Sequence, residues 1–456
     1  MGRRISISWR ALLAAVAVLG ALVAGLPTVA PGALAGADSP LPAISGGGSA
    51  DATAVSVVPG ALDLVSVYER STLSDGVRDR VLAAAGAVNV PVAPTRGFQI
   101  GMTTVWRNGS PVFQAANPDG GLWQVPMSAT AMDAWAVAAM MGRGLSAPVG
   151  AGNVLMSATS AAMHNAQAGD VVGLVTASGA VASVAIGAVV ADAIVGGSEL
   201  TMSRDLASAL GAGSDTGVVI FGHLDPAVVD GALGARGLLG DPDVRVRHTW
   251  DPQDPDSTLG LAATKQQLGE LSFKLTASGG ISVDGGWSSR YLGSREVYPT
   301  GISAQCNVVI EADLTAALQD VVNAGLAGAI DVANTNTYGG CYGPRYNRLS
   351  ANIGNLSRHT WAQAIDMNTT SNCQGCVPQM DCRVVRIFRA HGFAWGGNFL
   401  YPDGMHFEWT GRVTDQLSYP SRYCPNTPNG QSTQSQTPIG RSTFFDGATS
   451  QSGWSE

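Results

Sequence analysis

The sequence has few charged residues and almost no lysine. Charged residues make up 13% of the 456 residues, and only two of the 26 basic residues are lysines, Lys265 and Lys274. The formal net charge is −8, so the chain lacks the basic surplus that a nucleic-acid-binding protein needs. Hydrophobic residues reach 45%, which excludes a disordered acidic or basic chain. A chain of this length is expected to form two or three domains, tails included.

Cysteine is absent from the first two thirds of the chain. An even number of cysteines in an exported protein indicates disulfides, but the sequence does not choose among the possible pairings. A zinc cluster built around Cys373-x-x-Cys376, with the last two cysteines, is the alternative. The six cysteines are Cys306, Cys341, Cys373, Cys376, Cys382 and Cys424.

The first 35 residues are typical of a secretory signal peptide. Arg3, Arg4 and Arg10 precede an uncharged apolar run at 11–26, and Ala33-Leu34-Ala35 provides an A-x-A cleavage site. We therefore expect a secreted or extracytoplasmic protein of the cell envelope. Because the apolar run is long for a signal peptide, a retained membrane anchor is the alternative.

Composition divides the remaining chain into five parts. Gly, Ser, Ala and Pro dominate the first part, and Ser, Gln, Thr, Pro and Gly dominate the last. The predicted parts are a flexible spacer at 36–52, a mixed α/β domain of unknown type and function at 53–250, a linker and helix at 251–275, a second domain at 276–424 and a disordered tail at 425–456.

Local patterns predict several elements of the first domain. We expect a strand at 64–68, a helix that starts after the N-cap Ser74, and a hairpin through Asn108-Gly109, which accepts the positive φ angles of a type I′ turn. The apolar stretch at 171–195 is interrupted by Ser178-Gly179 and by Asp192, which favours paired strands over a membrane span.

The linker and the second domain carry further patterns. The acids of 251–256 and nearby His248 are predicted to be solvated, and Ser257 to cap a helix of about 14 residues. A later apolar-periodic helix is expected to end at His391-Gly392, because a histidine before a glycine is ordinary helix termination.

Residues suited to a metal site lie between Cys341 and Trp409. Alternation around Asp366 suggests a strand that presents this carboxylate on one face, and His406 and Glu408 share a face of a second strand. Two adjacent strands then bring His359, Asp366 and His406 to one zinc ion, with a fourth position left for water.

Neighbouring residues supply the other groups that hydrolysis needs. Asp403 precedes His406 closely enough to act as general base, and Glu408 is better suited to orient the His406 imidazole. Arg345 is the best candidate to bind a substrate carboxylate or a developing oxyanion. Trp395 either lines a substrate groove or packs in the core.

These patches resemble the M15 family of zinc peptidases, which cleave peptidoglycan stem peptides. The similarity rests on Ser357-x-His359 leading to Ala364-x-Asp366, and on Trp395-Gly396-Gly397 leading to the run from Asp403 to Glu408. It covers residues 276–424 and is closest to the VanY-like D,D-carboxypeptidases and the L-alanyl-D-glutamate endopeptidases. Ala362 replaces the usual glycine of the family.

The resemblance implies a role for each of these residues. His359, Asp366 and His406 would bind zinc, Asp403 would be the general base, and Arg345 would contact substrate. Ser357 would contact substrate or support a ligand.

The expected fold is α+β: a small antiparallel sheet with helices, as in M15 and hedgehog-like zinc domains, after the mixed α/β domain. The expected protein is a zinc metallopeptidase with one zinc ion, acting as a D-alanyl-D-alanine carboxypeptidase or an L-Ala-D-Glu-type endopeptidase. Residues 53–250 are a candidate docking region for an envelope protein, and the oligomeric state is left open. The alternative is a zinc-containing binding module without catalysis, as in hedgehog domains.

Overall fold

The structure, a computed structural model, describes residues 62–70, 72–347, 355–417 and 419–426. The predicted signal peptide at 1–35, the spacer at 36–52 and all but the first two residues of the predicted tail at 425–456 lie outside these ranges. Within the described ranges, no helix combines the length and the apolar character that membrane crossing requires.

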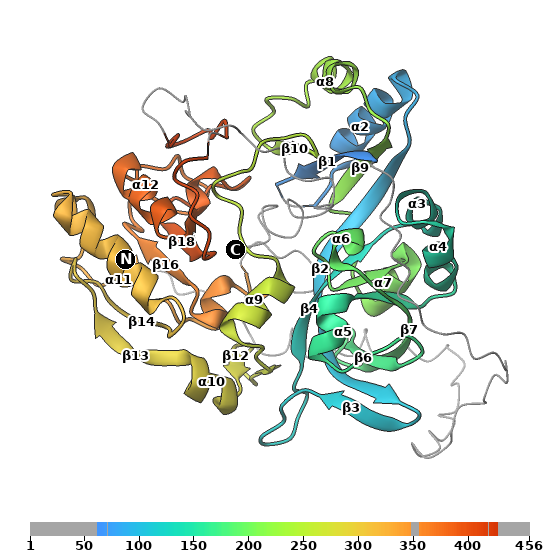
Figure 1. The fold of residues 1–456 in the computed structure, drawn as a ribbon, viewed down its shortest axis with the longest axis horizontal. Helices are drawn as coiled ribbons and strands as arrows, with labels where there is room; N and C mark the ends of the chain where they lie inside the picture. The colour runs from blue at the N-terminus through green and yellow to red at the C-terminus, as the bar shows by residue number, and fades with distance from the viewer. Residues whose placement is uncertain (1–61, 71, 348–354, 418, 427–456) are drawn as a thin grey trace, which may run out of the picture. The chain divides into compact units, whose positions relative to one another are not determined.

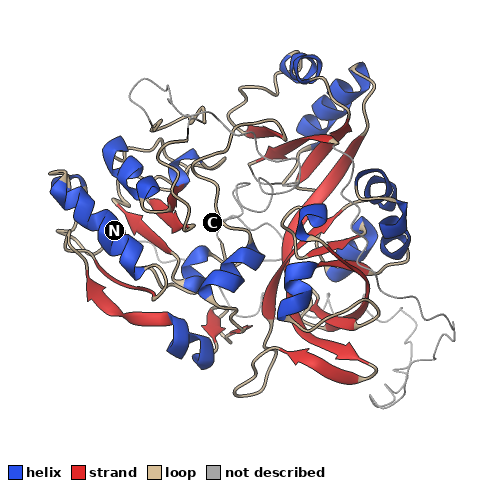
Figure 2. Cartoon of the chain, viewed as in Figure 1, coloured by secondary structure: helices blue, strands red, loops and turns tan. Residues whose placement is uncertain are grey.

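Ten strands of the described chain form one mixed sheet (Figures 1 and 2). They are β1 (Asp63–Glu69), β2 (Val92–Arg107), β3 (Ser110–Gln114), β4 (Val125–Ala131), β5 (Val154–Ser157), β6 (Val171–Val175), β7 (Val181–Val190), β8 (Leu200–Met202), β9 (Gly217–Gly222) and β10 (Val244–His248). The helices between them are α2 (Asp75–Ala87), α3 (Ala134–Met140), α4 (Arg143–Gly150), α5 (Ala158–Met163), α6 (Asp192–Val195), α7 (Arg204–Leu210) and α8 (Pro226–Gly234).

Six of these strands close into a barrel-like ring. The order runs β2, β4, β8, β5, β7, β6, and β6 pairs again with β2. One apolar cluster joins the strands, and Met102, Met127 and Leu174 are fully buried in it. The ring therefore has no open edge between β6 and β2, which removes two edges that would otherwise be free to pair with another chain.

The long strand β2 also belongs to a second, antiparallel arrangement. Its residues Val92–Thr95 pair with β9, and the order continues through β1 to β10. Helices α2 and α8 connect these strands in the order β-α-β-β-α-β, and Figure 1 shows both helices beside β1, β9 and β10. Val81 of α2 and Leu233 of α8 are fully buried against strand residues such as Val65.

Three local predictions for this region are confirmed. Helix α2 begins after Ser74, whose hydroxyl accepts a hydrogen bond of 3.2 Å from the backbone N–H of Val77. Asn108 (φ 51°) and Gly109 (φ 80°) form the turn between β2 and β3. The apolar stretch at 171–195 contains β6 and β7, which pair antiparallel.

The second half of the described chain contains shorter elements. They are α9 (Leu261–Leu268), β11 (Phe273–Leu275), β12 (Ile281–Val283), α10 (Gly285–Tyr291), β13 (Leu292–Val297), β14 (Ser303–Asn307), α11 (Glu311–Asn323), η1 (Ala327–Ala329), β15 (Tyr338–Gly339), η2 (Arg358–Trp361), β16 (Ala364–Met367), α12 (Cys382–Ala390), β17 (Phe393–Trp395), η3 (Gly396–Asn398) and β18 (His406–Trp409). The expected small antiparallel sheet is present, in the order β15-β16-β18-β17.

This four-stranded sheet has one apolar face. Phe407 of β18 lies 4.6 Å from Phe388 of α12, measured between ring centroids, and both belong to a cluster that includes Leu318 of α11. Figure 1 places α11 and α12 beside β16 and β18. Since side chains alternate along a strand, residues on either side of Phe407 point to the opposite face. Helix α12 ends at its C-cap His391, followed by Gly392 (φ 81°), as predicted.

The prediction of a solvated acidic linker at 251–256 is wrong. Asp254 and Asp256 are 3% and 2% exposed, and Asp254 pairs with the buried Arg247. The carboxylate of Asp256 accepts hydrogen bonds from the guanidinium of Arg389 at 2.5 and 2.9 Å. Proline and repeated acids resemble a linker in sequence, but here distant arginines neutralise the carboxylates inside the fold.

Two neighbouring predictions also need correction. The helix after the linker, α9, starts after Gly260 rather than Ser257 and is only eight residues long, because Gly269 (φ 84°) ends it. His248 is not solvated: its side chain is 10% exposed and its two ring nitrogens lie 2.9 and 3.0 Å from carboxylate oxygens of Asp251 and Asp230.

A buried ionic cluster joins α9 to the ten-stranded sheet. The Nζ of Lys265 lies 2.5 Å from Glu199 and 3.0 Å from Glu270, and it donates to the carbonyl of Pro126 at 3.1 Å. The side chains of Lys265 and Glu199 are both 0% exposed. Glu199 also accepts a hydrogen bond of 2.9 Å from the backbone N–H of Ser128. Removing one partner of such a group leaves the other charge buried, which is strongly destabilising.

We predict that Lys265→Met lowers the free energy of unfolding by about 3–5 kcal/mol, because Glu199 stays buried without its cation. Lys274→Met is the matched control, since Lys274 pairs with a carboxylate of Asp119 that is 57% exposed. It should cost about 1 kcal/mol or less. Chemical denaturation of the full chain measures both, and equal losses would contradict the assigned importance of the buried cluster.

The same cluster predicts a dependence of stability on pH. Burial alone raises the pKa of Glu270, but attraction to Lys265 and the hydrogen bond with His164 outweigh it and lower the pKa to about 2. The unfolded chain therefore binds this proton more readily. Glu270 contributes stability above the ordinary glutamate pKa near 4.5, and the contribution is lost as the pH falls toward 2. Denaturation of the wild type and of Glu270→Gln between pH 6 and about 2 tests this; the two should converge at low pH.

Candidate functional site

The three predicted metal ligands converge in the structure. His359 lies on η2, Asp366 on β16 and His406 at the start of β18, where the register pairs Asp366 directly with His406. Asp366 Oδ2 is 3.2 Å from His359 Nε2, and Asp366 Oδ1 is 3.1 Å from His406 Nδ1. One ligand atom from each residue lies within 4.8 Å of the others. A nitrogen, nitrogen and oxygen donor set of this size suits zinc.

The surroundings of His359 fix its ring. Its Nδ1 lies 3.2 Å from the carbonyl of Cys341, and since a carbonyl can only accept, Nδ1 carries the proton. Nε2, which lies 3.2 Å from Asp366 Oδ2, is then the ring nitrogen that a bound cation would take. Ser357 is the N-cap of η2, and its hydroxyl accepts a 3.3 Å hydrogen bond from the backbone N–H of His359.

Glu408 lies on the other side of His406. The carboxylate of Glu408 is fully buried, and its Oε2 lies 3.6 Å from His406 Nε2. Its Oε1 lies 3.4 Å from Arg358 Nε and accepts from Gln363 Nε2 at 3.3 Å. With Nε2 turned toward this carboxylate, Nδ1 is the His406 nitrogen that faces Asp366. At 3.6 Å the two atoms lie beyond hydrogen-bond distance, so the orienting role of Glu408 stays a prediction.

The electrostatics keep Asp366 ionised. Burial by itself raises the pKa of this carboxyl, but attraction to His359 and hydrogen bonds with both histidines outweigh it and hold the pKa well below its ordinary value. Gly339 of the adjacent strand leaves room for the group, because a Cβ at this position would lie 3.2 Å from Asp366 Oδ2. An ionised carboxylate between two imidazoles has the charge that a divalent metal requires.

Asp403, the predicted general base, lies beside His406. Its carbonyl accepts a 3.1 Å hydrogen bond from the backbone N–H of His406, and only 1% of the residue is exposed. A Cβ on Gly396 would lie 3.2 Å from the Cβ atoms of both Asp403 and His406. Because Gly396 has no side chain, the side chains of Asp403 and His406 can both lie against its backbone. Gln374 Nε2 donates to Asp403 Oδ2 at 3.4 Å.

Arg345 lies on the segment that pairs with η2. Its carbonyl accepts a 3.0 Å hydrogen bond from the N–H of Ser357, and its own N–H donates to the hydroxyl of Thr360 at 3.4 Å. Gly343 lies between Arg345 and His359: a Cβ at this position would be 3.5 Å from Arg345 Nη1 and 3.9 Å from the Cβ of His359. The half-buried Arg345 side chain therefore lies near His359.

Trp395 does not line a groove. It is 1% exposed, and its indole Nε1 donates to the carbonyl of Gly404 at 2.9 Å. The substrate-groove interpretation is wrong and the core-packing alternative holds. Through this hydrogen bond Trp395 instead fixes the turn between Asp403 and His406.

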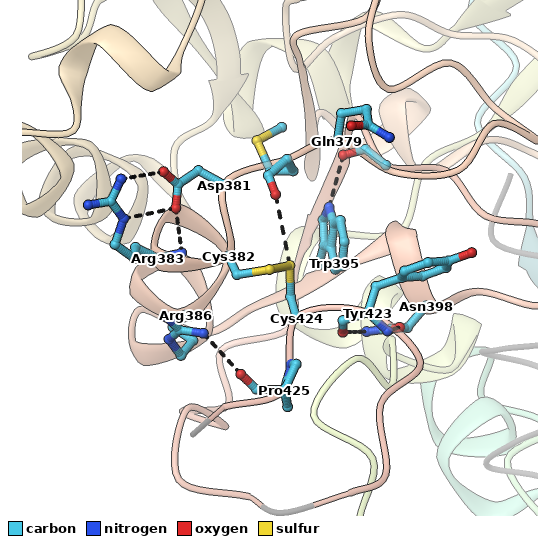
Figure 3. Close-up of a disulfide and its surroundings, with 12 residues drawn as sticks. Gln379, Asp381, Cys382, Arg383, Arg386, Trp395, Asn398, Tyr423, Cys424 and Pro425 are labelled. Carbon is cyan, nitrogen blue, oxygen red and sulfur yellow. Dashed lines mark hydrogen bonds and ion pairs between the residues drawn. A yellow bond between two sulfur atoms is a disulfide. The ribbon is translucent and has the colours of Figure 1, made fainter. Parts of the chain in front are cut away.

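The cysteines form three disulfides, and none of the described cysteines is free. The pairs are Cys306–Cys341, Cys373–Cys376 and Cys382–Cys424. The zinc-cluster alternative for the last four cysteines is therefore wrong. Figure 3 shows Cys382–Cys424, which ties the start of α12 to the last described residues; nearby, Arg386 donates to the carbonyl of Pro425 at 3.0 Å.

Sequence reasoning missed several residues that support the site. Gln374 carries no motif, and only its position inside Cys373-x-x-Cys376 distinguishes it. Arg358 is the unspecified residue of the Ser357-x-His359 pattern, yet its guanidinium donates to Thr264 at 2.9 Å and to the carbonyl of Leu259 at 2.6 Å. These contacts come from segments far away in the sequence and leave no local signal.

Comparison with protein families finds a match in the second half of the chain. A family model described as D-alanyl-D-alanine carboxypeptidase, from the M15 peptidases, matches residues 351–409, which contain η2, β16, β17 and β18. The match supports an M15 family domain and, in general terms, a peptidase. It does not select the VanY-like branch. No curated protein matches the chain.

Ala362, which replaces the usual family glycine, has φ 53° and ψ 34° and is fully buried. This is a left-handed backbone conformation, which L-residues adopt at a cost of about 1–2 kcal/mol. We predict that Ala362→Gly raises the free energy of unfolding by up to about 1 kcal/mol. Ala364→Gly, in strand β16, is the control and should lower it by about 0.5–1 kcal/mol. Thermal denaturation of both variants measures the difference. A lower free energy of unfolding in Ala362→Gly would contradict backbone strain at Ala362.

Proposed function

We propose that this protein is an exported zinc-dependent peptidase that hydrolyses peptidoglycan stem peptides. The observation that carries the proposal is the buried His359–Asp366–His406 cluster, which lies inside the segment matched by the M15 family model. Each residue presents a ligand atom toward the other two, from three separate elements of the fold.

The residues present fit one zinc ion. His359 through Nε2, His406 through Nδ1 and the ionised carboxylate of Asp366 would hold it, while the remaining nitrogen of each imidazole faces a carbonyl or a carboxylate. When bound, zinc in such a site polarises the scissile carbonyl and lowers the pKa of water to about 7.

Asp403 and Arg345 supply the remaining chemistry. The Asp403 carboxylate takes the proton from the attacking water and returns it to the leaving amine, as general base and then general acid. Its burial beside His406 keeps it from bulk water. The Arg345 guanidinium, held against η2, binds the negative charge of a substrate carboxylate or of the developing oxyanion. Ser357 and Glu408 orient the two histidines rather than touch substrate.

The bond cleaved is the finer part of the proposal. A carboxypeptidase recognises a free terminal carboxylate, and Arg345 suits that task; an endopeptidase needs an open groove that accepts chain on both sides. Incubating the full chain with a defined pentapeptide and, separately, with cross-linked muropeptides distinguishes the two. Release of D-alanine alone would exclude the endopeptidase.

Export and docking are part of the same proposal. Three disulfides support an oxidising compartment, as the predicted signal peptide also does. We propose further that residues 53–250 dock to an envelope protein. A pulldown with the full chain is compared with a pulldown in which the exposed apolar residues of the ten-stranded sheet are replaced. Recovery of the same partners in both would contradict docking through this region.

We predict that His406→Ala abolishes zinc binding, because one of three ligands is lost, and that Asp403→Asn keeps the zinc but lowers cleavage about 100- to 10,000-fold through loss of the base. Metal analysis and muropeptide cleavage are measured on the same preparations. His391→Ala is the control histidine variant, since His391 caps α12 and pairs with the exposed Asp320. Zinc without cleavage in the wild type would favour the hedgehog-like binding module, and no zinc at all would refute the assigned site.

A further inference from the structure

The loop closed by the Cys373–Cys376 disulfide packs directly against the segment that carries Asp403. The backbone N–H of Gly375 donates to the carbonyl of Pro402 at 2.6 Å, and residues Gln374 and Asp403 form an isolated antiparallel bridge. On the N-terminal side of the loop, the N–H of Met405 donates to the carbonyl of Asn372 at 3.1 Å. Loop and segment thus lie side by side as a short two-stranded ribbon.

Two glycines show how closely the ribbon is packed. A Cβ on Gly375 would lie 2.3 Å from the hydroxyl of Tyr401, and a Cβ on Gly404 would lie 2.9 Å from both Asn372 Oδ1 and a Pro378 carbon. Neither position accepts a side chain without displacing its neighbours. Any movement of the loop is therefore passed to the residues on either side of Asp403.

Within this ribbon one side chain reaches the carboxylate itself. Gln374 Nε2 donates to Asp403 Oδ2 at 3.4 Å, from a residue that is itself half-buried. The amide is neutral, so it fixes the direction of the carboxylate without pairing its charge. A general base must lie within hydrogen-bond reach of the proton that it takes, and small misplacements cost large factors in rate.

We propose that Gln374 is a positioning residue for Asp403 and that the Cys373–Cys376 disulfide holds it in place, so that opening this one disulfide lowers turnover without releasing the metal. The proposal rests on the proposed function only for the role of Asp403. The position of the loop against residues 402–405 stands independently of that role.

The disulfide is accessible to a dithiol reductant. Cys373 and Cys376 are half-buried, and Gly375 and Val377 beside them are exposed, whereas Cys306 and Cys341 are fully buried. One thiolate of the reductant attacks a sulfur of the pair and forms a mixed disulfide, and its second thiol then resolves this bond. Two cysteine thiols are produced and the dithiol is oxidised to a disulfide, which balances the exchange.

The test uses the full chain and two matched glutamine variants. In Gln374→Leu, kcat for muropeptide cleavage should fall between about tenfold and a hundredfold, with KM and zinc content unchanged. Gln379→Leu makes the same replacement on the same stretch of chain, where the amide donates only to the carbonyl of Val377, and should behave as wild type. A drop in zinc content in Gln374→Leu, or an unchanged kcat, would overturn the positioning role.

A second measurement does not depend on catalysis. Hydrogen exchange at Met405 and Gly375, whose N–H groups bridge the ribbon, should accelerate when wild type is treated with a mild dithiol and in Cys373→Ser/Cys376→Ser without treatment. The double variant should show lowered kcat and no further response to the dithiol. If the wild type is inactive but its exchange accelerates with the dithiol, the proposed function fails and the role of the disulfide in holding the loop stands. If the wild type is active but its exchange is unchanged, the role of the disulfide is overturned.

Discussion

The antiparallel register between β16 and β18 is the constraint on which the site depends. It pairs Asp366 with His406 and Ala364 with Glu408, so that three polar side chains share one face. The same alternation sends Phe407 to the other face, where α11 and α12 bury it. A slip of one residue would place Phe407 among the ligands and the histidine in the apolar core, so burial of one face enforces the geometry of the other.

Buried carboxylates then connect this sheet to the rest of the chain. Asp256 receives the guanidinium of Arg389, and it also accepts hydrogen bonds from the N–H of Trp395 at 3.1 Å and from Asn398 Nδ2 at 2.8 Å. Glu408 performs an equivalent task for Arg358, whose Nε lies 3.4 Å from its Oε1. Asp256, in the acidic segment before α9, thus holds the residues around Trp395 in place. The geometry of the candidate site therefore depends on residues outside the matched family segment.

The sequence predicted the parts of the molecule whose signals are local. Ser74 as a cap, the Asn108-Gly109 turn, the end of α12 and the convergence of His359, Asp366 and His406 each follow from a short pattern and its period. The acids of the linker were misread because their partners, Arg247 and Arg389, are invisible in a local window. Trp395 was undecided for a related reason: an indole next to a glycine pair suits a groove or a core equally, and only the carbonyl of Gly404 decides between them.

The pairing of the first strand has a consequence for how the chain acquires its structure. Val65 of β1 pairs with Ile220 of β9 on one side and with His248 of β10 on the other. A chain that grows from its N-terminus therefore holds an apolar strand without either partner until β9 has been made, and with one edge unpaired until β10 follows. Contacts between residues so far apart in the sequence form slowly, because the entropy cost of closing the intervening loop precedes the stabilisation that pairing gives. The newly made chain consequently passes through a period in which β1 is exposed to aggregation, and a chaperone that binds extended apolar segments would act during that interval.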